Sequence, residues 1–194
     1  MCDVKREPPM WLIVTGPPAS GKTTLARRLA RDLNMPLYEK DIFKDTLFQS
    51  LGVGDKDWSQ QVGRSAISLL FVVAHQILST GSSLVTECNF STRLSSEQVG
   101  EIADNSGARV VQVHCSASPE ILVERNAARL ASPKLRPGHH VMTSEELLEG
   151  VRSGVWEPLE VPSKIVRVDT SGSFNYASVL RDIVQDAPHP SRDR

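Results

Sequence analysis

The fold is decided by one stretch of sequence, Gly16-Pro17-Pro18-Ala19-Ser20-Gly21-Lys22-Thr23. It fills every defining position of the phosphate-binding pattern G-x-x-x-x-G-K-[ST]. An apolar run at residues 10–15 precedes it, and a helical pattern follows, with leucines at positions 25, 29 and 33 on one stripe. The strand–loop–helix context is the one in which such a loop binds phosphate, because backbone N–H groups and a helix N-terminus converge there.

The residue types in this loop have separate tasks. Its glycines let consecutive N–H groups surround a phosphate chain, Lys22 reaches the β- and γ-phosphates, and the Thr23 hydroxyl ligates Mg²⁺. We therefore expect the whole loop, together with Thr24, to bind a nucleoside triphosphate. Lys22 is a candidate catalytic residue and Thr23 a candidate metal ligand.

The overall composition narrows the class of protein. The chain has 194 residues, with 22 basic and 23 acidic side chains and a formal net charge of −1. This length suits a single domain with a sizeable core. The balanced charge excludes a globally basic surface for nucleic acid, although a local basic groove stays open.

The cysteines and the chain start indicate a location. Cysteines at positions 2, 88 and 115 are odd in number and scattered, which excludes a disulfide framework and a zinc site. Together with nucleotide binding they fit a reducing cytoplasm. Residues 1–9 lack the apolar stretch of a signal peptide, and the longest apolar run, at 69–74, is too short to span a bilayer. We expect a cytoplasmic protein without a membrane segment.

Short apolar runs alternate with helical patterns along the chain, which predicts a parallel sheet wrapped by helices. The expected strands lie near residues 10–15, 36–39, 82–87, 108–114 and 164–169. The expected helices lie near residues 22–34, 41–51, 57–80, 95–105, 118–131, 143–153 and 174–186. Residues 1–9 and 187–194 are polar and contain prolines, so we expect flexible tails around one domain at 10–186.

Local patterns support several of the helices. Ser95 with Gln98, and Thr143 with Glu146, fit capping boxes, and Pro119 fits the first position of a helix. The 57–80 helix carries one long apolar stripe, which we expect to face the core rather than a partner. The stripe consists of Val62, Ala66, Leu69, Val73 and Ile77.

Two acidic residues lie at or just after the ends of predicted strands, at the edge where the phosphate loop lies. Asp41 comes just after the second strand and is a candidate base for the proton of an attacking hydroxyl; its alternative role is to cap the next helix. Glu87 ends the third strand and is a candidate for holding hydrated Mg²⁺. Its alternatives are to contact substrate or to support Arg93.

Arginines and a proline-rich loop follow in the 118–131 helix and beyond it. Arg125 and Arg129 lie four residues apart and so share a helix face, and Arg136 follows in the basic loop. Arginines so placed stabilise a transferring phosphoryl group; the alternative is a solvated face paired with Glu120 and Glu124. We expect residues 125–142 to form a lid.

Two further segments have weaker signals. His139 and His140 are adjacent and have no carboxylate or cysteine cluster beside them, so we expect a lid histidine that touches nucleotide or substrate rather than a metal site. Residues 168–172, which include Asp169, follow the last strand. They are candidates for wrapping the adenine, with an ordinary turn as the alternative.

Taken together, these pieces resemble a known family. Gly16–Thr23, Lys40-Asp41-x-x-Lys44, Glu87-x-Asn89 and Arg125-x-x-x-Arg129, in this order within about residues 10–172, resemble the polynucleotide-kinase-like branch of P-loop kinases. That branch includes the kinase part of bacteriophage polynucleotide kinase, chloramphenicol phosphotransferase and the zeta toxins, and is often labelled AAA-domain ATP-binding proteins. The resemblance implies a three-layer α/β/α fold with a helical lid and a five-stranded parallel sheet ordered 2-3-1-4-5.

The resemblance also implies roles. Asp41 matches the general base, Lys40 or Lys44 the basic residue beside the substrate, and Arg125 and Arg129 the lid arginines. We expect nucleotide contacts from Arg125 and Asp169 besides the loop, with ATP and Mg²⁺ as cofactors and Thr23 and Glu87 at the metal. The expected substrate-binding residues are Lys40, Lys44, Glu87, Asn89, Arg93 and Arg136.

These expectations combine into one function with open alternatives. We expect a kinase that transfers the γ-phosphoryl group of ATP to a hydroxyl group of a small molecule. A polynucleotide 5′-hydroxyl kinase stays open, as do an NTPase that couples hydrolysis to a partner and a nucleotide-sensing module. The oligomeric state also stays open.

Overall fold

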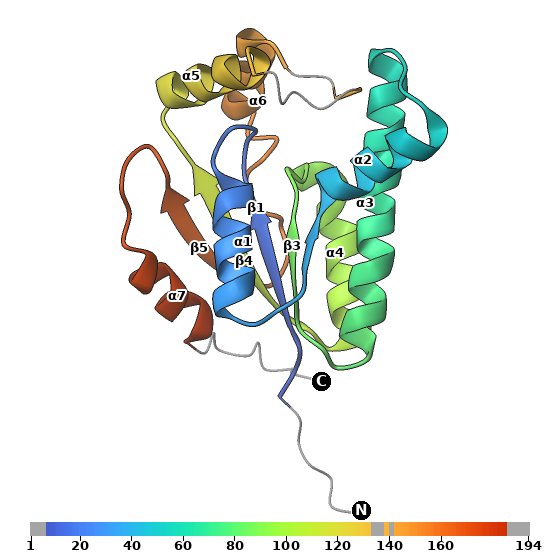
Figure 1. The fold of residues 1–194 in the computed structure, drawn as a ribbon. Helices are drawn as coiled ribbons and strands as arrows, with labels where there is room; N and C mark the ends of the chain where they lie inside the picture. The colour runs from blue at the N-terminus through green and yellow to red at the C-terminus, as the bar shows by residue number, and fades with distance from the viewer. Residues whose placement is uncertain (1–6, 133–137, 140–141, 186–194) are drawn as a thin grey trace, which may run out of the picture.

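The computed structural model describes residues 7–132, 138–139 and 142–185, so most of the two predicted tails lies outside the described residues. Five strands form one parallel sheet in the order β2-β3-β1-β4-β5, which confirms the predicted order (Figure 1). The strands are β1 (Met10–Thr15), β2 (Leu37–Glu39), β3 (Leu84–Glu87), β4 (Arg109–Ser116) and β5 (Lys164–Asp169).

The described helices complete the predicted three-layer α/β/α fold. They are α1 (Lys22–Asp32), α2 (Lys40–Leu51), α3 (Lys56–Ser79), α4 (Thr92–Ser106), α5 (Pro119–Leu130), α6 (Ser144–Arg152) and α7 (Tyr176–Val184). In Figure 1, α1 and α7 cover one face of the sheet, α3 and α4 cover the other, and α5 and α6 lie above the end of the sheet where the phosphate loop is.

Strand β1 shows why both faces are covered. Leu12 and Val14 point into the core shared with α1 and α7, whereas Trp11 and Ile13 point into the core shared with α3 and α4. All four side chains are fully buried. Because successive side chains of a strand point to opposite faces, a continuous apolar run must be buried on both sides, as parallel sheets require.

The strand register determines which residues lie beside the phosphate loop. Val14 of β1 and Glu39 of β2 are both partners of Glu87 in β3, the strand that lies between them. The carboxyl ends of these three strands therefore meet at one edge of the sheet, directly beside the loop that follows β1. This edge is where ligands bind in open α/β sheets.

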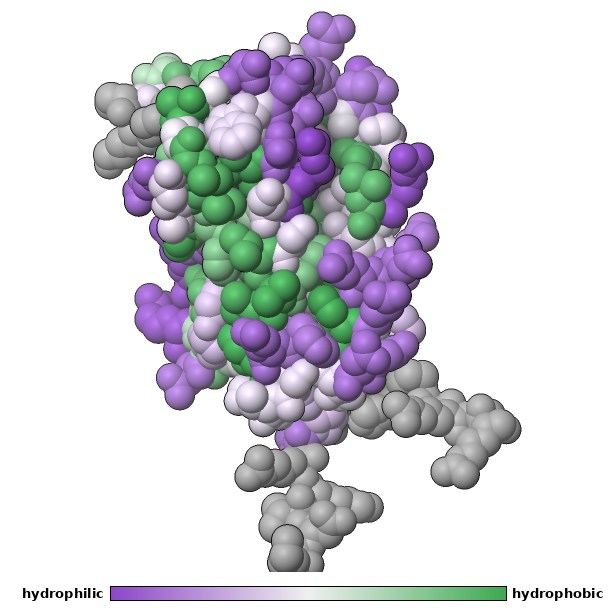
Figure 2. Space-filling model, turned by 90° about the vertical axis from the view of Figure 1, so that its right-hand side faces the viewer, coloured by the Kyte–Doolittle hydropathy of each residue, from purple (hydrophilic) through white to green (hydrophobic). Residues whose placement is uncertain are grey.

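Helix α3 corrects part of the predicted stripe. Val62 and Ala66 are buried as expected, but the buried line continues through Leu70 and Ala74, and Leu69 is 41% exposed. The 3.6-residue period allows either continuation, and packing against the sheet and α4 selects the second. Figure 2 shows the side of the molecule that lies at the right in Figure 1, where apolar side chains gather in the middle and hydrophilic ones surround them.

Helix α3 also bears on the membrane expectation. By length and composition it is the one helix in the described part of the chain that could cross a membrane, a test that core helices of soluble proteins also pass. The unbroken run at 69–74 understates the apolar character of the whole helix. In this fold α3 buries Leu70, Phe71, Ala74 and Leu78 against the sheet.

The helix starts confirm two of three capping predictions. Thr143 and Glu146 form the predicted capping box, and Ser118 caps α5 with proline in its first turn. The prediction for Ser95 is wrong, because α4 begins three residues earlier with Ser91 as its N-cap, and Ser95 is buried inside the helix. Docking of Thr92 onto the backbone of Val155 and Glu157 accounts for the earlier start.

Candidate functional site

The phosphate loop is shaped by two glycines that no other residue can replace without strain. Gly16 has φ +134°, and a Cβ there would lie 2.0 Å from the carbonyl oxygen of Cys115 in β4. Gly21 has φ +79° and caps α1. The Lys22 ammonium donates a hydrogen bond to the Pro17 carbonyl across the loop at 2.9 Å. The predicted loop is therefore built as its sequence requires.

One cavity of about 650 Å³ opens at this loop, within the size range of small-molecule sites. Most of the residues predicted for the site line it. They are Pro18, Ala19, Gly21, Lys22, Thr23, Thr24, Lys40, Asp41, Lys44, Glu87, Asn89, Arg125 and Arg129.

Other predicted residues lie elsewhere. Arg93 is exposed on α4 and does not line the cavity, and its predicted contact with substrate loses support. Asp169 is also exposed, and its carboxylate accepts hydrogen bonds from the backbone and side chain of Ser171. This arrangement corresponds to the ordinary turn that was the alternative prediction for residues 168–172. Gly16, Pro17 and Ser20 form the buried body of the loop. Arg136 and His140 lie outside the described residues.

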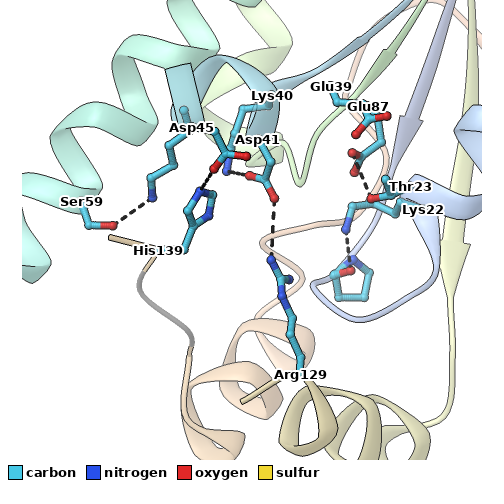
Figure 3. Close-up of polar contacts among 12 residues, drawn as sticks. Lys22, Thr23, Glu39, Lys40, Asp41, Asp45, Ser59, Glu87, Arg129 and His139 are labelled. Atoms are coloured by element: carbon cyan, nitrogen blue, oxygen red, sulfur yellow. Dashed lines mark hydrogen bonds and ion pairs between the residues drawn. The ribbon is translucent and has the colours of Figure 1, made fainter. Parts of the chain in front are cut away.

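Thr23 and Glu87 meet where a metal ion is expected. The Thr23 hydroxyl donates to Glu87 Oε2 at 3.2 Å (Figure 3). Burial raises the pKa of Glu87, and the charge of Lys22 opposes this rise. A hydroxyl and a carboxylate are hard oxygen donors, which is the set that Mg²⁺ takes beside nucleotide phosphates, so these residues fit the ion. The described residues contain no group of three or more His, Cys, Asp or Glu that could hold a metal.

An ion pair that the sequence did not indicate, between a half-exposed arginine and a buried carboxylate, lies beside Glu87. Glu39, which is the strand partner of Glu87, is 3% exposed and takes a bidentate pair from Arg27 at 2.6 and 2.8 Å. Arg27 lies one helical turn after Thr23 and thus fastens α1 to the end of β2. The signal in the sequence was present, an arginine four residues after the loop threonine, but a surface role was equally consistent with it.

Asp41 lies across the cavity from the phosphate loop, between two cations. Lys40 donates to its Oδ1 at 2.7 Å, and the Arg129 guanidinium lies 3.8 Å from its Oδ2 (Figure 3). Burial would raise the pKa of Asp41, but the adjacent Lys40, with help from His139 and Arg129, holds it well below its ordinary value. Asp41 makes no capping hydrogen bond, because Glu39 is the N-cap of α2. The carboxylate is therefore ionised and faces the cavity.

Lys44 lies one turn after Lys40 and is only 7% exposed. Its ammonium donates to the Ser59 hydroxyl of α3 at 3.0 Å and lies 5.4 Å from the centre of the Phe48 ring. Burial and the nearby Lys40 charge lower the pKa of Lys44 to about 8. This residue lines the cavity on the side away from the phosphate loop.

Gly138 and His139 reach this same corner from the predicted lid. Ser59 donates to the Gly138 carbonyl at 2.7 Å. His139 Nε2 lies 2.6 Å from Asp45 Oδ1 (Figure 3). The His139 ring also packs edge-on against Phe48. The sequence predicted a lid histidine but missed its partners, since Asp45 and Ser59 belong to no recognisable motif. These contacts dock the Gly138–His139 segment onto α2 and α3.

Arg125 connects three parts of the site rather than reaching freely into the cavity. Its guanidinium donates to the hydroxyl of Thr170 at 3.0 Å, to the carbonyl of Thr170 at 2.6 Å and to the Ala19 carbonyl at 3.5 Å. Thr170 in turn donates to the Ser20 carbonyl at 3.0 Å. Arg125 therefore fixes α5 to the phosphate loop and to the end of β5. Arg129, 44% exposed in its side chain, is the more exposed of the two.

Cys88 also lines the cavity, and it too was missed as a site residue. Burial raises the pKa of its thiol to about 12, so it is a thiol and not a nucleophile at neutral pH.

Comparison with known proteins identifies the family. A family model for the AAA domain matches residues 11–151. A solved structure from Chloroflexus aurantiacus J-10-fl, provisionally described as a kinase, is 38% identical, covers 90% of this chain and 96% of its own, and has a TM-score of 0.83. No curated protein was matched by sequence.

More distant structures share the fold alone. Kti12 from Chaetomium thermophilum in complex with ADP-AlF3 is 19% identical, covers 89% of this chain and 95% of its own, and has a TM-score of 0.62. A gluconokinase from Sinorhizobium meliloti 1021 is 21% identical, covers 92% and 91%, and has a TM-score of 0.55. Together with the phosphate loop and the family match, these findings confirm the predicted resemblance: the chain belongs to the AAA domain family, within the P-loop kinase group.

Proposed function

We propose that this protein is an ATP- and Mg²⁺-dependent phosphotransferase whose acceptor is a hydroxyl group of a small molecule. The observation that carries the proposal is that one cavity is lined both by the phosphate loop and by the ionised carboxylate of Asp41. A base and a phosphate site on opposite walls of one cavity are the two parts that transfer to a hydroxyl requires. The description of the Chloroflexus relative as a kinase is in line with it.

On the nucleotide side, the loop amides and Lys22 bind the β- and γ-phosphates. Mg²⁺, held through the Thr23 hydroxyl and the Glu87 carboxylate, would neutralise charge on these phosphates. Arg125 holds α5 against the loop through Ala19 and Thr170, so the nucleotide binds between fixed walls.

On the acceptor side, Asp41 orients the attacking hydroxyl and accepts its proton as the oxygen bonds to the γ-phosphorus and the bond to ADP breaks. Lys40 holds the carboxylate in place. Arg129, which lies near Asp41 and is half exposed, is positioned to turn toward the transferring phosphoryl group and stabilise its charge.

The experiment is a transfer assay with ATP labelled in the γ-phosphate and a panel of hydroxyl compounds that includes sugars, sugar acids, nucleosides and 5′-hydroxyl oligonucleotides. Transfer of label to a small acceptor, abolished by EDTA, supports the proposal. Release of labelled phosphate at the same rate with and without every acceptor indicates an NTPase instead. Tight binding of ATP without any turnover indicates a sensing module. The cytoplasm, where ATP is available, is the compartment we propose for this activity.

A further inference from the structure

Helix α3 presents an uncharged surface on the side that faces away from the sheet. Leu70, Ala74 and Leu78 are buried along one face of the helix. The residues on the opposite face are all exposed and form what we call the outer stripe: Gln61, Ser65, Ser68, Leu69, Val72, Gln76 and Ser79. Leu69 and Val72, at the middle of the outer stripe, are 41% and 54% exposed.

The lack of charge distinguishes the outer stripe from the exposed faces of other helices. Exposed charged residues are regularly spaced on α1, with Arg27, Arg28 and Arg31, and on α4, with Glu97, Glu101 and Asp104. Between positions 58 and 79, Arg64 is the one Lys, Arg, Asp or Glu residue, and helical spacing places it beside the outer stripe. Single exposed leucines or valines are common on protein surfaces. A long helix face without any charge is not typical of a face that contacts only water.

Helix α3 is also more apolar than its burial within one chain requires. An apolar window of 18 residues in this helix is only 33% buried. The Ser68 hydroxyl donates to the Arg64 carbonyl one turn earlier at 3.2 Å, so covering this serine costs no hydrogen bond. Figure 2 views the side of the molecule where α3 lies in Figure 1, and apolar side chains gather in the middle of that side. The outer stripe is therefore suited to be covered.

The order of residues in the outer stripe makes it complementary to itself. In an antiparallel pair of α3 helices, centred between Leu69 and Val72, each of these residues faces the other one in the second copy. Ser65 then faces Gln76, so apolar side chains meet apolar ones and uncharged polar side chains meet uncharged polar ones. A two-fold interface requires this pattern, because residue i contacts residue j and j contacts i.

A second copy fits the outer stripe better than a membrane does. Helices that lie on a membrane surface combine a broad apolar face with many Lys and Arg residues. The outer stripe has two large apolar side chains among serines and glutamines, and Arg64 is the one basic residue of its length apart from His75.

We infer that this protein forms a two-fold symmetric dimer in which the outer stripes of two α3 helices pack antiparallel. The contact would run for about 27 Å along each helix and bury about 1,000 Å² in total, which is at the low end of specific interfaces. We therefore expect a reversible dimer with a Kd of about 1–100 μM. The inference does not depend on the proposed function.

The first test is sedimentation velocity of the full chain over a range of concentrations from about 1 to 200 μM, which spans the expected Kd. Val72→Glu brings two carboxylates together at the centre of the contact, so we expect a Kd at least about 30-fold higher than that of wild type. Val72 is exposed, and circular dichroism should show an unchanged fold. Val184→Glu, at a valine of α7 that is 57% exposed, is the matched control and should dimerise like wild type.

The second test determines the direction of packing by disulfide cross-linking in a Cys2→Ser background. The double variant Ser65→Cys/Gln76→Cys should give a covalent dimer on mild oxidation, because position 65 of one copy faces position 76 of the other. The two cysteines lie about 16 Å apart along one helix, so they cannot pair within a chain. Ser65→Cys alone should stay monomeric under the same oxidation.

The possible outcomes decide between the second copy and its alternatives. Sedimentation as a monomer at every concentration overturns the inference, and so does a dimer that Val72→Glu leaves intact. Cross-linking of Ser65→Cys alone as efficient as that of the double variant overturns the antiparallel arrangement. Binding to phosphatidylcholine vesicles that Val72→Glu abolishes, without self-association in solution, assigns the outer stripe to a membrane surface and overturns the dimer. None of these measurements uses phosphoryl transfer, so their result is separate from that of the transfer assay.

Discussion

The two sides of the cavity, which we propose bind the nucleotide and the acceptor, are built in different ways. The phosphate loop is made largely of backbone, from eight consecutive residues whose two glycines permit its shape. The acceptor side is made of side chains that come from α2, α3, α5 and the Gly138–His139 segment. The loop can therefore be recognised by its motif, whereas the acceptor side can vary without losing the fold. This difference explains why the donor of a P-loop kinase is easier to infer than its acceptor.

Removal of the proposed base, Asp41, should give the largest difference between the effect on phosphoryl transfer and the effect on ATP binding. Asp41→Asn keeps the size of the side chain and removes its basicity, so we expect transfer to fall about 10²–10⁴-fold while ATP affinity stays the same. The measurements are kcat for transfer and the Kd for ATP. An equal loss in both quantities would assign Asp41 to the nucleotide side instead.

Loss of the loop lysine should affect the nucleotide side and catalysis together. Lys22→Ala removes a charge that the β- and γ-phosphates contact, and we expect a loss of about 3–4 kcal/mol in transition-state stabilisation, or a rate lower by about 10²–10³. The fold should be unchanged by circular dichroism, since the one hydrogen bond that the Lys22 ammonium makes within the described residues goes to the Pro17 carbonyl of its own loop. If a folded Lys22→Ala variant turns over like wild type, the assignment of this loop to phosphate binding in catalysis is wrong.

The docked lid segment should affect the acceptor side alone. Gly138 has φ +78°, and a Cβ there would lie 2.9 Å from Val53 and 3.1 Å from Phe48. Gly138→Ala should therefore weaken the docking and raise the acceptor KM about 5–30-fold, with little change in ATP affinity. Gly172→Ala, where no atom lies within 4 Å of the new Cβ, is the matched control. A rise in the KM for ATP of the same size would show that the segment serves both sides.

The smallest effect concerns the stability of the acceptor side. The pKa of Lys44 is about 8 in the folded protein and 10.5 as its ordinary value, so between these pH values the unfolded chain binds more protons and stability rises with pH. Lys44→Met removes the buried charge and should be more stable than wild type by about 1–3 kcal/mol at pH 7.

This advantage of Lys44→Met should shrink as the pH rises from 8 to 10.5, because Lys44 in wild type loses its charge. Urea unfolding at pH 7, 8.5 and 10 measures it. Lys164→Met, at a lysine of β5 that is less buried than Lys44, should show a smaller pH dependence. If the difference in unfolding free energy between wild type and Lys44→Met stays constant over this range, burial does not destabilise the Lys44 ammonium.

Almost all of the fold could be predicted from the sequence, and the wrong predictions are confined to parts of single helices. The strands β1 and β5 match the predicted bounds, and the sheet order follows from the resemblance. The start of α4 was wrong because Ser91 and Ser95 both suit an N-cap, and contacts with residues 155–157 select the first. The stripe of α3 shifted because helical spacing permits two lines of apolar residues and only packing chooses one.

The site residues, like the elements of the fold, could be predicted where they depend on position in the sheet and not where they depend on packing. Lys22, Thr23, Asp41 and Glu87 line the cavity because each lies in the loop, at the end of a strand or just after one, and parallel strands bring such positions to one edge. Arg93 and Asp169 were placed in the site by sequence position, but the turn of α4 and a local turn after β5 leave both exposed. Position along the chain does not say which way a side chain points.

The sequence by itself determined the phosphate loop, the parallel sheet and the carboxylates at its edge, because these depend on contiguous patterns and on strand direction. Only the tertiary structure decided the burial of Lys44 beside Ser59, the pairing of Glu39 with Arg27 and the docking of His139 on Asp45. His139 and Asp45 are 94 positions apart, so their contact exists only once the lid segment meets α2. Burial and pairing are properties of the packed chain, and they set the charge that the acceptor side offers to its ligand.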